Sequence, residues 1–170
     1  MELSRRAFLS AQRPRQESVF RPPWAIAELQ FQEQCTRCDE CIRICPTKLL
    51  VKGSGGFPEE DFIPGHADDG CTFCAQCVDV CSAHVLKKNA DASPWQQVAV
   101  IGDACLTKQN VVCRTCGERC DVSAIRFPPR LGGVSLPQLD AGSCTGCGAC
   151  LSDCPTRAIR ILSIAQQGAA

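Results

Sequence analysis

The chain has few aromatic residues and no excess of either charge. Its 170 residues include no Tyr, two Trp and seven Phe, so the sequence predicts small hydrophobic cores rather than one large aromatic core. Eighteen basic residues balance eighteen acidic ones, whereas nucleic-acid-binding domains carry a basic patch or a basic excess. No apolar run reaches the roughly 18 residues that a membrane-spanning helix requires. We therefore expect no nucleic-acid partner and no membrane span.

The amino-terminal segment lacks the apolar region of an export signal. Residues 4–9 contain the pair Arg5-Arg6 and resemble a twin-arginine motif, but residues 10–17 are polar and charged. A signal peptide needs an apolar stretch at that point. We therefore expect a cytoplasmic protein in which residues 1–23 form a flexible basic arm, with Arg13, Arg15 and Arg21 in contact with solvent.

Cysteine is the abundant residue, and all 16 cysteines fall into four groups. The first, second and fourth groups follow the pattern Cys-x2-Cys-x2-Cys-x3-Cys, which is the spacing of [4Fe–4S] ligands in bacterial ferredoxins. The pattern predicts up to four [4Fe–4S] clusters and a role in one-electron transfer. The candidate ligands are Cys35, Cys38, Cys41 and Cys45; Cys71, Cys74, Cys77 and Cys81; Cys105, Cys113, Cys116 and Cys120; and Cys144, Cys147, Cys150 and Cys154.

Disulfides and zinc are the alternative uses of so many cysteines. Disulfides are typical of small secreted proteins, and no secretion signal is visible here. Structural zinc sites use cysteine pairs that are far apart in the sequence, whereas these groups have two x2 spacings followed by an x3 spacing. The spacing therefore favours iron–sulfur clusters. His66 and His84 are isolated, and we do not expect either to be a ligand.

Each cluster is expected to take ligands from two groups. Three cysteines at i, i+3 and i+6 wrap one face of a cluster, and in two-cluster ferredoxins the fourth cysteine of the run binds the other cluster. The predicted sets are Cys35, Cys38 and Cys41 with Cys81; Cys71, Cys74 and Cys77 with Cys45; Cys105, Cys113 and Cys116 with Cys154; and Cys144, Cys147 and Cys150 with Cys120.

The third group differs from the others by an insertion. Seven residues, 106–112, separate Cys105 from Cys113, where the other groups have two. We favour the interpretation that this insertion loops out and leaves Cys105 as a ligand of an intact four-iron cluster. The alternative is a labile or three-iron centre.

The order of the groups predicts an α+β fold of two tandem bacterial two-[4Fe–4S] ferredoxin-like units, at residues 24–90 and 96–164. Such a unit runs twice through strand, cysteine loop, short helix and strand. The rival topology nests the first group with the fourth and the second with the third.

Local patterns support two tandem units. The expected strands lie at 49–51, 97–101, 125–127 and 158–162, and 97–101 is the strongest because it is rich in β-branched residues. Gly146 and Gly148 are expected to leave room for the backbone beside a cluster. Trp24 and Trp95 precede the two units and are predicted to be packing residues.

With these motifs in place, the chain resembles the NapF family, the ferredoxin-type accessory proteins of the periplasmic nitrate reductase system. The resemblance covers nearly the whole length, from the segment Ser4-Arg5-Arg6 onward. Its more specific points are the stretch Arg21-Pro22-Pro23-Trp24 and the widened third group. The cysteine runs alone would fit any protein with several ferredoxin motifs.

The resemblance implies a cytoplasmic iron–sulfur protein whose partner is the precursor of the nitrate reductase catalytic subunit. It implies help with the maturation of that subunit before export, by electron transfer or by handling of a cluster or cofactor. The sequence has no flavin, nicotinamide or nucleophile motif, so we do not expect an enzyme. Two alternatives stay open: an electron-transfer subunit of a larger oxidoreductase complex, and a free soluble ferredoxin.

Overall fold

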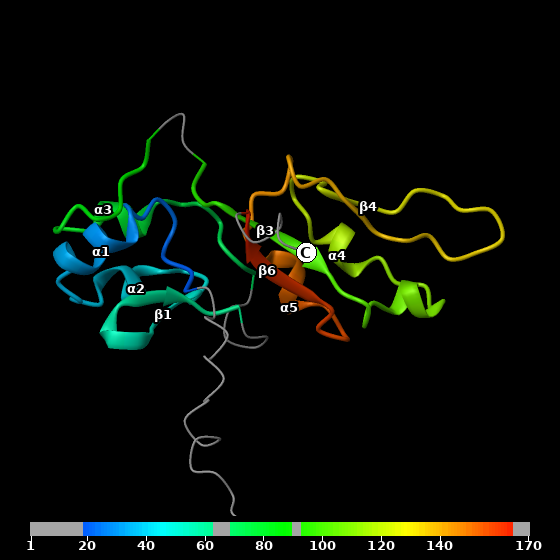
Figure 1. The fold of residues 1–170 in the computed structure, drawn as a ribbon, viewed down its shortest axis with the longest axis horizontal. Coiled ribbons are helices and arrows are strands. Elements are labelled where there is room, and N and C mark those ends of the chain that lie inside the picture. The colour runs from blue at the N-terminus through cyan, green and yellow to red at the C-terminus, as the bar shows by residue number, and fades with distance from the viewer. Residues whose placement is uncertain (1–18, 63–68, 90–92, 165–170) are drawn as a thin grey trace, which may run out of the picture.

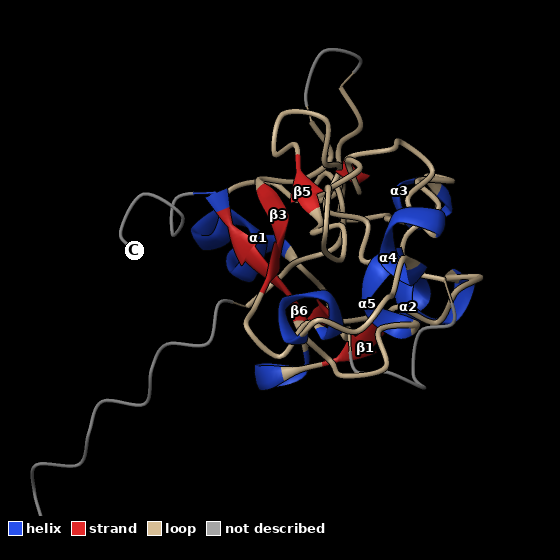
Figure 2. Cartoon of the chain, turned by 90° about the vertical axis from the view of Figure 1, so that its right-hand side faces the viewer, coloured by secondary structure: helices blue, strands red, loops and turns tan. Residues whose placement is uncertain are grey.

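The computed structural model describes residues 19–62, 69–89 and 93–164, which form two halves side by side along the longest axis (Figure 1). The half drawn in blue to green holds the first two cysteine groups, and the half drawn in green to red holds the other two. Loops make up most of the chain, and the helices and strands between them are short (Figure 2). Among the described residues, no helix is long and apolar enough to cross a membrane.

The first half is built around one hairpin. Its elements are α1 (Glu28–Gln34), α2 (Glu40–Ile44), β1 (Leu50–Lys52), the 3-10 helix η1 (Ser54–Gly56), β2 (Pro58–Glu60) and α3 (Gln76–Asp79). β1 and β2 are antiparallel, with Val51 opposite Glu59. Gly55 and Gly56 in the turn have φ of 67° and 79°, which glycine adopts without steric cost. An antiparallel bridge between Ala25 and Leu86 closes this half.

The second half repeats this plan with a longer outer strand pair. Its elements are β3 (Gln97–Ile101), the 3-10 helix η2 (Leu106–Gln109), α4 (Thr115–Glu118), β4 (Ile125–Arg126), β5 (Gln138–Leu139), α5 (Ala149–Ser152) and β6 (Ile159–Ser163). β3 pairs antiparallel with β6, and Ala99 lies opposite Ile161. β4 and β5 form the inner hairpin. The predicted strand at 97–101 is confirmed, and the other predicted strands lie within one residue of their expected start.

The pairing of the outer segments distinguishes the two topologies. In each half the first and last β-segments pair with each other and enclose one hairpin. This arrangement fits two tandem ferredoxin-like units and differs from the nested topology. The fold is α+β with small antiparallel sheets, as predicted.

Each half has its own hydrophobic core, and cysteines belong to both. The core of the first half contains Phe31, Leu50, Cys77, Val85 and Leu86. The core of the second half contains Ala99, Cys116, Ile125, Cys150, Leu151, Ile159 and Ile161. Because the cysteines are part of the cores, whatever the thiols bind also lies within the packed interior.

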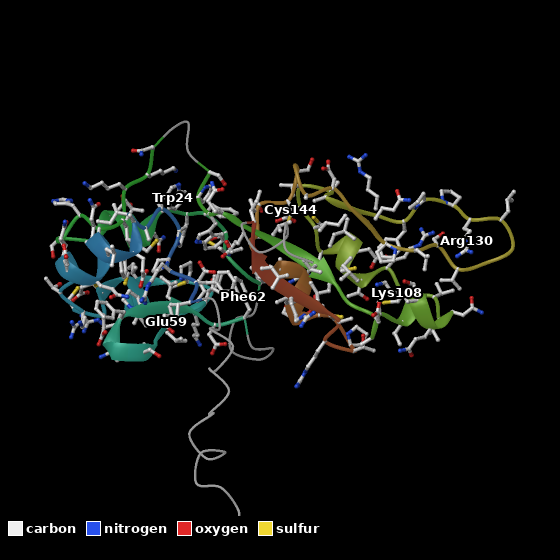
Figure 3. All side chains as sticks on the ribbon, in the orientation of Figure 1. Trp24, Glu59, Phe62, Lys108, Arg130 and Cys144 are labelled. Carbon is white, nitrogen blue, oxygen red and sulfur yellow. The ribbon has the colours of Figure 1, made fainter. Side chains whose placement is uncertain are left out.

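Three aromatic side chains attach the segment before β3 to the first half. The ring of Phe73 lies between Trp24 and Trp95, with centroids 6.3 and 5.3 Å away. Trp95 is 8% exposed, and its Nε1 donates a hydrogen bond to the carbonyl oxygen of Arg21 at 3.1 Å. Trp24, labelled in Figure 3, is also buried. Both tryptophans are packing residues, as predicted.

Arg21 is packed into the first half, whereas the sequence predicted that it contacts solvent. Its guanidinium lies 2.6 Å from Oε1 of Glu28 and 3.3 Å from Oε1 of Glu59, and it covers the ring of Phe31. Pro22 beside it is fully buried. The packed part of the chain therefore begins before residue 24. Arg13 and Arg15 lie outside the described residues.

Replacing Trp95 by Ala should lower the free energy of unfolding by about 3–5 kcal/mol, because the substitution leaves a cavity beside Phe73. The measurement is denaturant unfolding of the anaerobic holoprotein, followed by circular dichroism. Leu131→Ala is the control, because Leu131 is fully exposed at 102% and its loss should change stability by less than about 0.5 kcal/mol. Equal effects of the two substitutions would contradict the packing role of Trp95.

Candidate metal centres

The structure gathers the 16 cysteines around four cavities, with four cysteines lining each. None of these thiols forms a disulfide. Three cysteines of each set come from one group, and the fourth comes from the other group of the same half. These four sets are the ones expected from the sequence. The first quartet is Cys35, Cys38, Cys41 and Cys81; the second is Cys45, Cys71, Cys74 and Cys77; the third is Cys105, Cys113, Cys116 and Cys154; the fourth is Cys120, Cys144, Cys147 and Cys150.

Left-handed backbone at repeated positions bends the loops around the cavities. In the first, second and fourth groups, positive φ occurs on both sides of the second cysteine. A further residue with positive φ lies three positions after the last cysteine of every group. Such a conformation is uncommon outside glycine and persists where the surrounding structure fixes it. The residues are Arg37 and Asp39, Phe73 and Ala75, Gly146 and Gly148, and then Lys48, His84, Ser123 and Arg157.

Close packing, rather than the shape of the loop, explains why the fourth group has two glycines. At the equivalent positions of the first and second groups, other residue types adopt the same positive φ. A Cβ atom on Gly146 would lie 2.6 Å from Cγ of Gln97, and one on Gly148 would overlap the ring of Phe62. Gln97 begins β3, and Phe62 belongs to the first half. The room that the sequence predicted beside a cluster is therefore used by these two side chains.

The insertion in the third group folds back on itself. It begins with η2, and the N–H of Val111 then donates a hydrogen bond to the carbonyl oxygen of Leu106 at 2.9 Å. Asn110, with φ of 65°, reverses the chain between them. Cys105 consequently lines the same cavity as Cys113 and the rest of the third quartet. This geometry favours a complete four-cysteine site over a three-iron centre.

Threonine hydroxyls lie against sulfur atoms of the second and third quartets. Because a thiolate has no proton to donate, the hydroxyl becomes the donor once the sulfur binds iron. The second quartet has one such contact and the third has three. The Oγ1···Sγ distances are 3.6 Å for Thr47 and Cys45, 3.2 Å for Thr107 and Cys105, 3.6 Å for Thr115 and Cys113, and 3.9 Å for Thr156 and Cys154.

Burial and crowding oppose deprotonation of the thiols when no cation is present. Burial raises the pKa of Cys41 and Cys150 to about 12, and the charge of neighbouring thiols adds to this effect. The same causes raise the pKa of Cys77 and Cys116 to about 11. Iron supplies the positive charge that stabilises four thiolates in one cavity, and its binding therefore releases protons.

The donor sets fit an iron–sulfur cluster. Within the described ranges, no three His, Cys, Asp or Glu side chains are grouped so as to hold a single metal ion. The four sulfurs of each quartet instead surround a shared cavity with nearly all-apolar walls. Thiolates are the usual ligands of [4Fe–4S] clusters.

Glu60 is a buried carboxyl group between the halves that the sequence analysis did not find. Its Oε2 accepts a hydrogen bond from Nε2 of Gln97 at 3.0 Å, and the same Nε2 lies 3.1 Å from the carbonyl oxygen of Gly146. Burial raises the pKa of Glu60 well above its usual range, and the bond from Gln97 offsets this only in part. Nothing in the sequence distinguishes this residue from Glu59 beside it.

Comparison with known proteins supports iron–sulfur binding in both halves. Residues 34–85 and 111–158 each match the 4Fe-4S dicluster domain family. The chain is 44% identical over 146 residues to the ferredoxin-type protein NapF of Haemophilus influenzae, which covers 86% of this chain and 80% of that protein. It is 38% identical over 159 residues to NapF of Escherichia coli K12, which covers 94% of each chain.

The chain belongs to the NapF family of ferredoxin-type proteins. It is also 30% identical over 174 residues to the methylamine utilization ferredoxin-type protein MauM of Methylophilus methylotrophus, which covers 92% of this chain and 76% of that protein. As a ferredoxin-type protein with two dicluster matches, it binds several [4Fe–4S] clusters and transfers electrons rather than acting as an enzyme.

The crossed quartets predict which pairs of cysteine substitutions cause additive losses of iron. Cys38→Ser and Cys81→Ser fall in the same quartet, so the double variant should lose about four iron atoms, as each single variant does. Cys38 and Cys45 belong to one sequence group but to different quartets, so Cys38→Ser with Cys45→Ser should lose about eight.

Iron and sulfide counts on anaerobically prepared protein measure these losses. If the combination of Cys38 and Cys81 lost twice as much iron as the combination of Cys38 and Cys45, each group would hold its own cluster. The crossed arrangement would then be wrong.

Proposed function

We propose that this protein is an accessory protein of the periplasmic nitrate reductase system that carries four [4Fe–4S] centres, one in each quartet. The observation that carries the proposal is the arrangement of all 16 cysteines around four cavities in a chain of the NapF family. When bound, each cluster accepts and returns one electron. Every cysteine is thereby assigned as a ligand, Cys105 included.

The residues of this chain hold and insulate the centres. The cysteine thiolates bind iron, and the two cores keep water away from the buried sulfurs, such as those of Cys77, Cys116 and Cys150. Cys38 and Cys74 are exposed, so the first and second centres come nearest to the surface at these two residues. We place the contact with an electron donor there.

The two halves are proposed to be ferredoxin-like units at residues 24–90 and 96–164, preceded by an arm at residues 1–23 whose last residues pack on the first unit. The outer strand pairs support the division, because each encloses the two cysteine groups of its own half. The packing of Arg21 and Pro22 assigns the end of the arm to the first unit.

The proposed partner is the cytoplasmic precursor of the catalytic subunit of the periplasmic nitrate reductase. The protein would supply electrons to that precursor, or handle its cluster or cofactor, before export. Support comes from the identity to NapF proteins over most of the chain. The stretch Arg21-Pro22-Pro23-Trp24, on which the family resemblance partly rests, is packed in the first half. It therefore contributes to the fold of the first half.

A pull-down with the tagged holoprotein should recover the precursor of the catalytic subunit and not its mature periplasmic form, because the contact occurs before export. Deleting the gene should lower nitrate reductase activity more than the amount of that enzyme. Complementation with the Cys38→Ser, Cys74→Ser double variant should fail to restore activity, because two centres are missing.

Two results would contradict the maturation role. Recovery of neither form, with unchanged enzyme activity in the deletion strain, would leave a free electron carrier. Copurification with a large partner in fixed stoichiometry would instead indicate a permanent electron-transfer subunit.

A further inference from the structure

The loops of the second and fourth quartets touch each other directly across the two halves. The N–H of Cys71 donates a hydrogen bond to the carbonyl oxygen of Cys147 at 2.8 Å. Gly70, at φ of 73°, makes this approach possible, because a Cβ atom there would lie 2.5 Å from the nitrogen of Ala149 and closer still to the oxygen of Cys147. Of the described hydrogen bonds between the halves, this is the one that joins two cysteines.

Buried groups fix this junction from both sides. Gln97 connects Glu60 of the first half to Gly146 in the loop of the fourth quartet. The ring of Phe62 packs against the core of the second half and against Gly148. Phe62 and Cys144 both lie where the halves meet, whereas Lys108 and Arg130 lie toward the far end of the second half (Figure 3). At the surface, Arg119 adds one ion pair across the halves, to Asp69, and a second one within its own half, to Asp153.

Within each half, the two quartets are also neighbours. α2 packs on α3, and α4 packs on α5. The first of these contacts joins the helix that carries Cys41 of the first quartet to the helix that carries Cys77 of the second. The second joins the helix that carries Cys116 of the third quartet to the helix that carries Cys150 of the fourth.

We propose that the four centres form one electron relay in the spatial order first, second, fourth, third quartet, and that electrons cross between the halves at the contact of Cys71 with Cys147. The inference rests on the proposed assignment of the quartets as cluster ligands. In each step, one centre is oxidised by one electron and its neighbour is reduced by one electron. No bond forms or breaks, and no further reactant is needed inside the protein.

The order has a consequence for the ends of the molecule. Since the first and third quartets lie at the two ends of the relay, an electron that enters at the first quartet passes through all four centres before it leaves at the third. The inserted residues 106–112 therefore lie at one end of the relay and not at its middle.

The test compares two matched variants of the full-length protein. Cys38 and Cys74 are each the second cysteine of a group, and both are exposed. Cys38→Ser removes the centre of the first quartet, and Cys74→Ser removes that of the second. Each variant is prepared anaerobically, counted at about 12 iron atoms, reduced with dithionite and examined by pulsed EPR for magnetic coupling between the two halves.

We expect strong coupling between the halves in the unsubstituted protein and in Cys38→Ser, and its loss in Cys74→Ser. Coupling that survives in Cys74→Ser, or that disappears in Cys38→Ser alone, would overturn the order. If either variant loses more than one centre, the corresponding pair of variants in the second half provides the test. There Cys147→Ser should abolish the coupling and Cys113→Ser should retain it. These readouts do not involve the nitrate reductase, so they can fail while the maturation role holds.

The distribution of hydroxyl contacts carries a second inference. Donors to sulfur stabilise the reduced centre, which carries the additional negative charge, and so raise its reduction potential. Thr107, Thr115 and Thr156 all lie against sulfurs of the third quartet. Of the described hydrogen bonds, none ends on a sulfur of the first quartet. We infer that the third quartet has the highest potential and is the electron-accepting end of the relay.

A redox titration followed by EPR tests this inference. Thr107→Val should shift the component of highest potential downward, because Thr107 is buried at 3% exposure and makes the shortest of these contacts. Thr47→Val is the matched control and should leave that component unchanged, because Thr47 lies against the second quartet. The inference fails if the component of highest potential is unaffected by Thr107→Val or moves with Thr47→Val.

Discussion

The electrostatic cost of placing four thiolates in one buried cavity is the constraint on which the rest of the structure depends. Burial raises the pKa of thiols such as Cys41 and Cys150 to about 12, so the quartets need a cation to become ligands. The helices and strands are short, and buried cysteines belong to both hydrophobic cores. The free energy of cluster binding is therefore part of the free energy of folding. The loops that carry the cysteines include left-handed backbone at residues such as Arg37 and Phe73, which persists only where the surrounding structure fixes it.

A second constraint is the junction between the halves, which is too closely packed to act as a flexible linker. Phe62 of the first half fills space beside Gly148 of the second, and Gln97 connects Glu60 to the loop of the fourth quartet. The polar groups at this junction are buried and directional, so they fix one relative position of the two halves. A fixed position is what an electron relay requires, because the rate of electron transfer falls steeply as the distance between centres grows.

The sequence predicted the cysteine sets and the main strands, because both depend on local rules. Ligand spacing determines which three cysteines share a cavity, and a β-branched run predicts β3. The contacts between the halves could not be predicted in this way. Glu60 and Phe62 stand in a segment with no motif, and their roles depend on Gln97 and Gly148, which are far away in the sequence. Arg21 was predicted as part of a solvated arm because charge pattern alone does not show Glu28 and Glu59 closing around it.

The most direct test of the account is native mass spectrometry of the anaerobically purified full-length protein. Four quartets that each hold one cluster predict a mass that exceeds that of the bare chain by four [4Fe–4S] units, with about 16 iron and 16 sulfide per chain. Three clusters at most, or zinc without sulfide, would contradict the assignment of all 16 cysteines to four cluster sites.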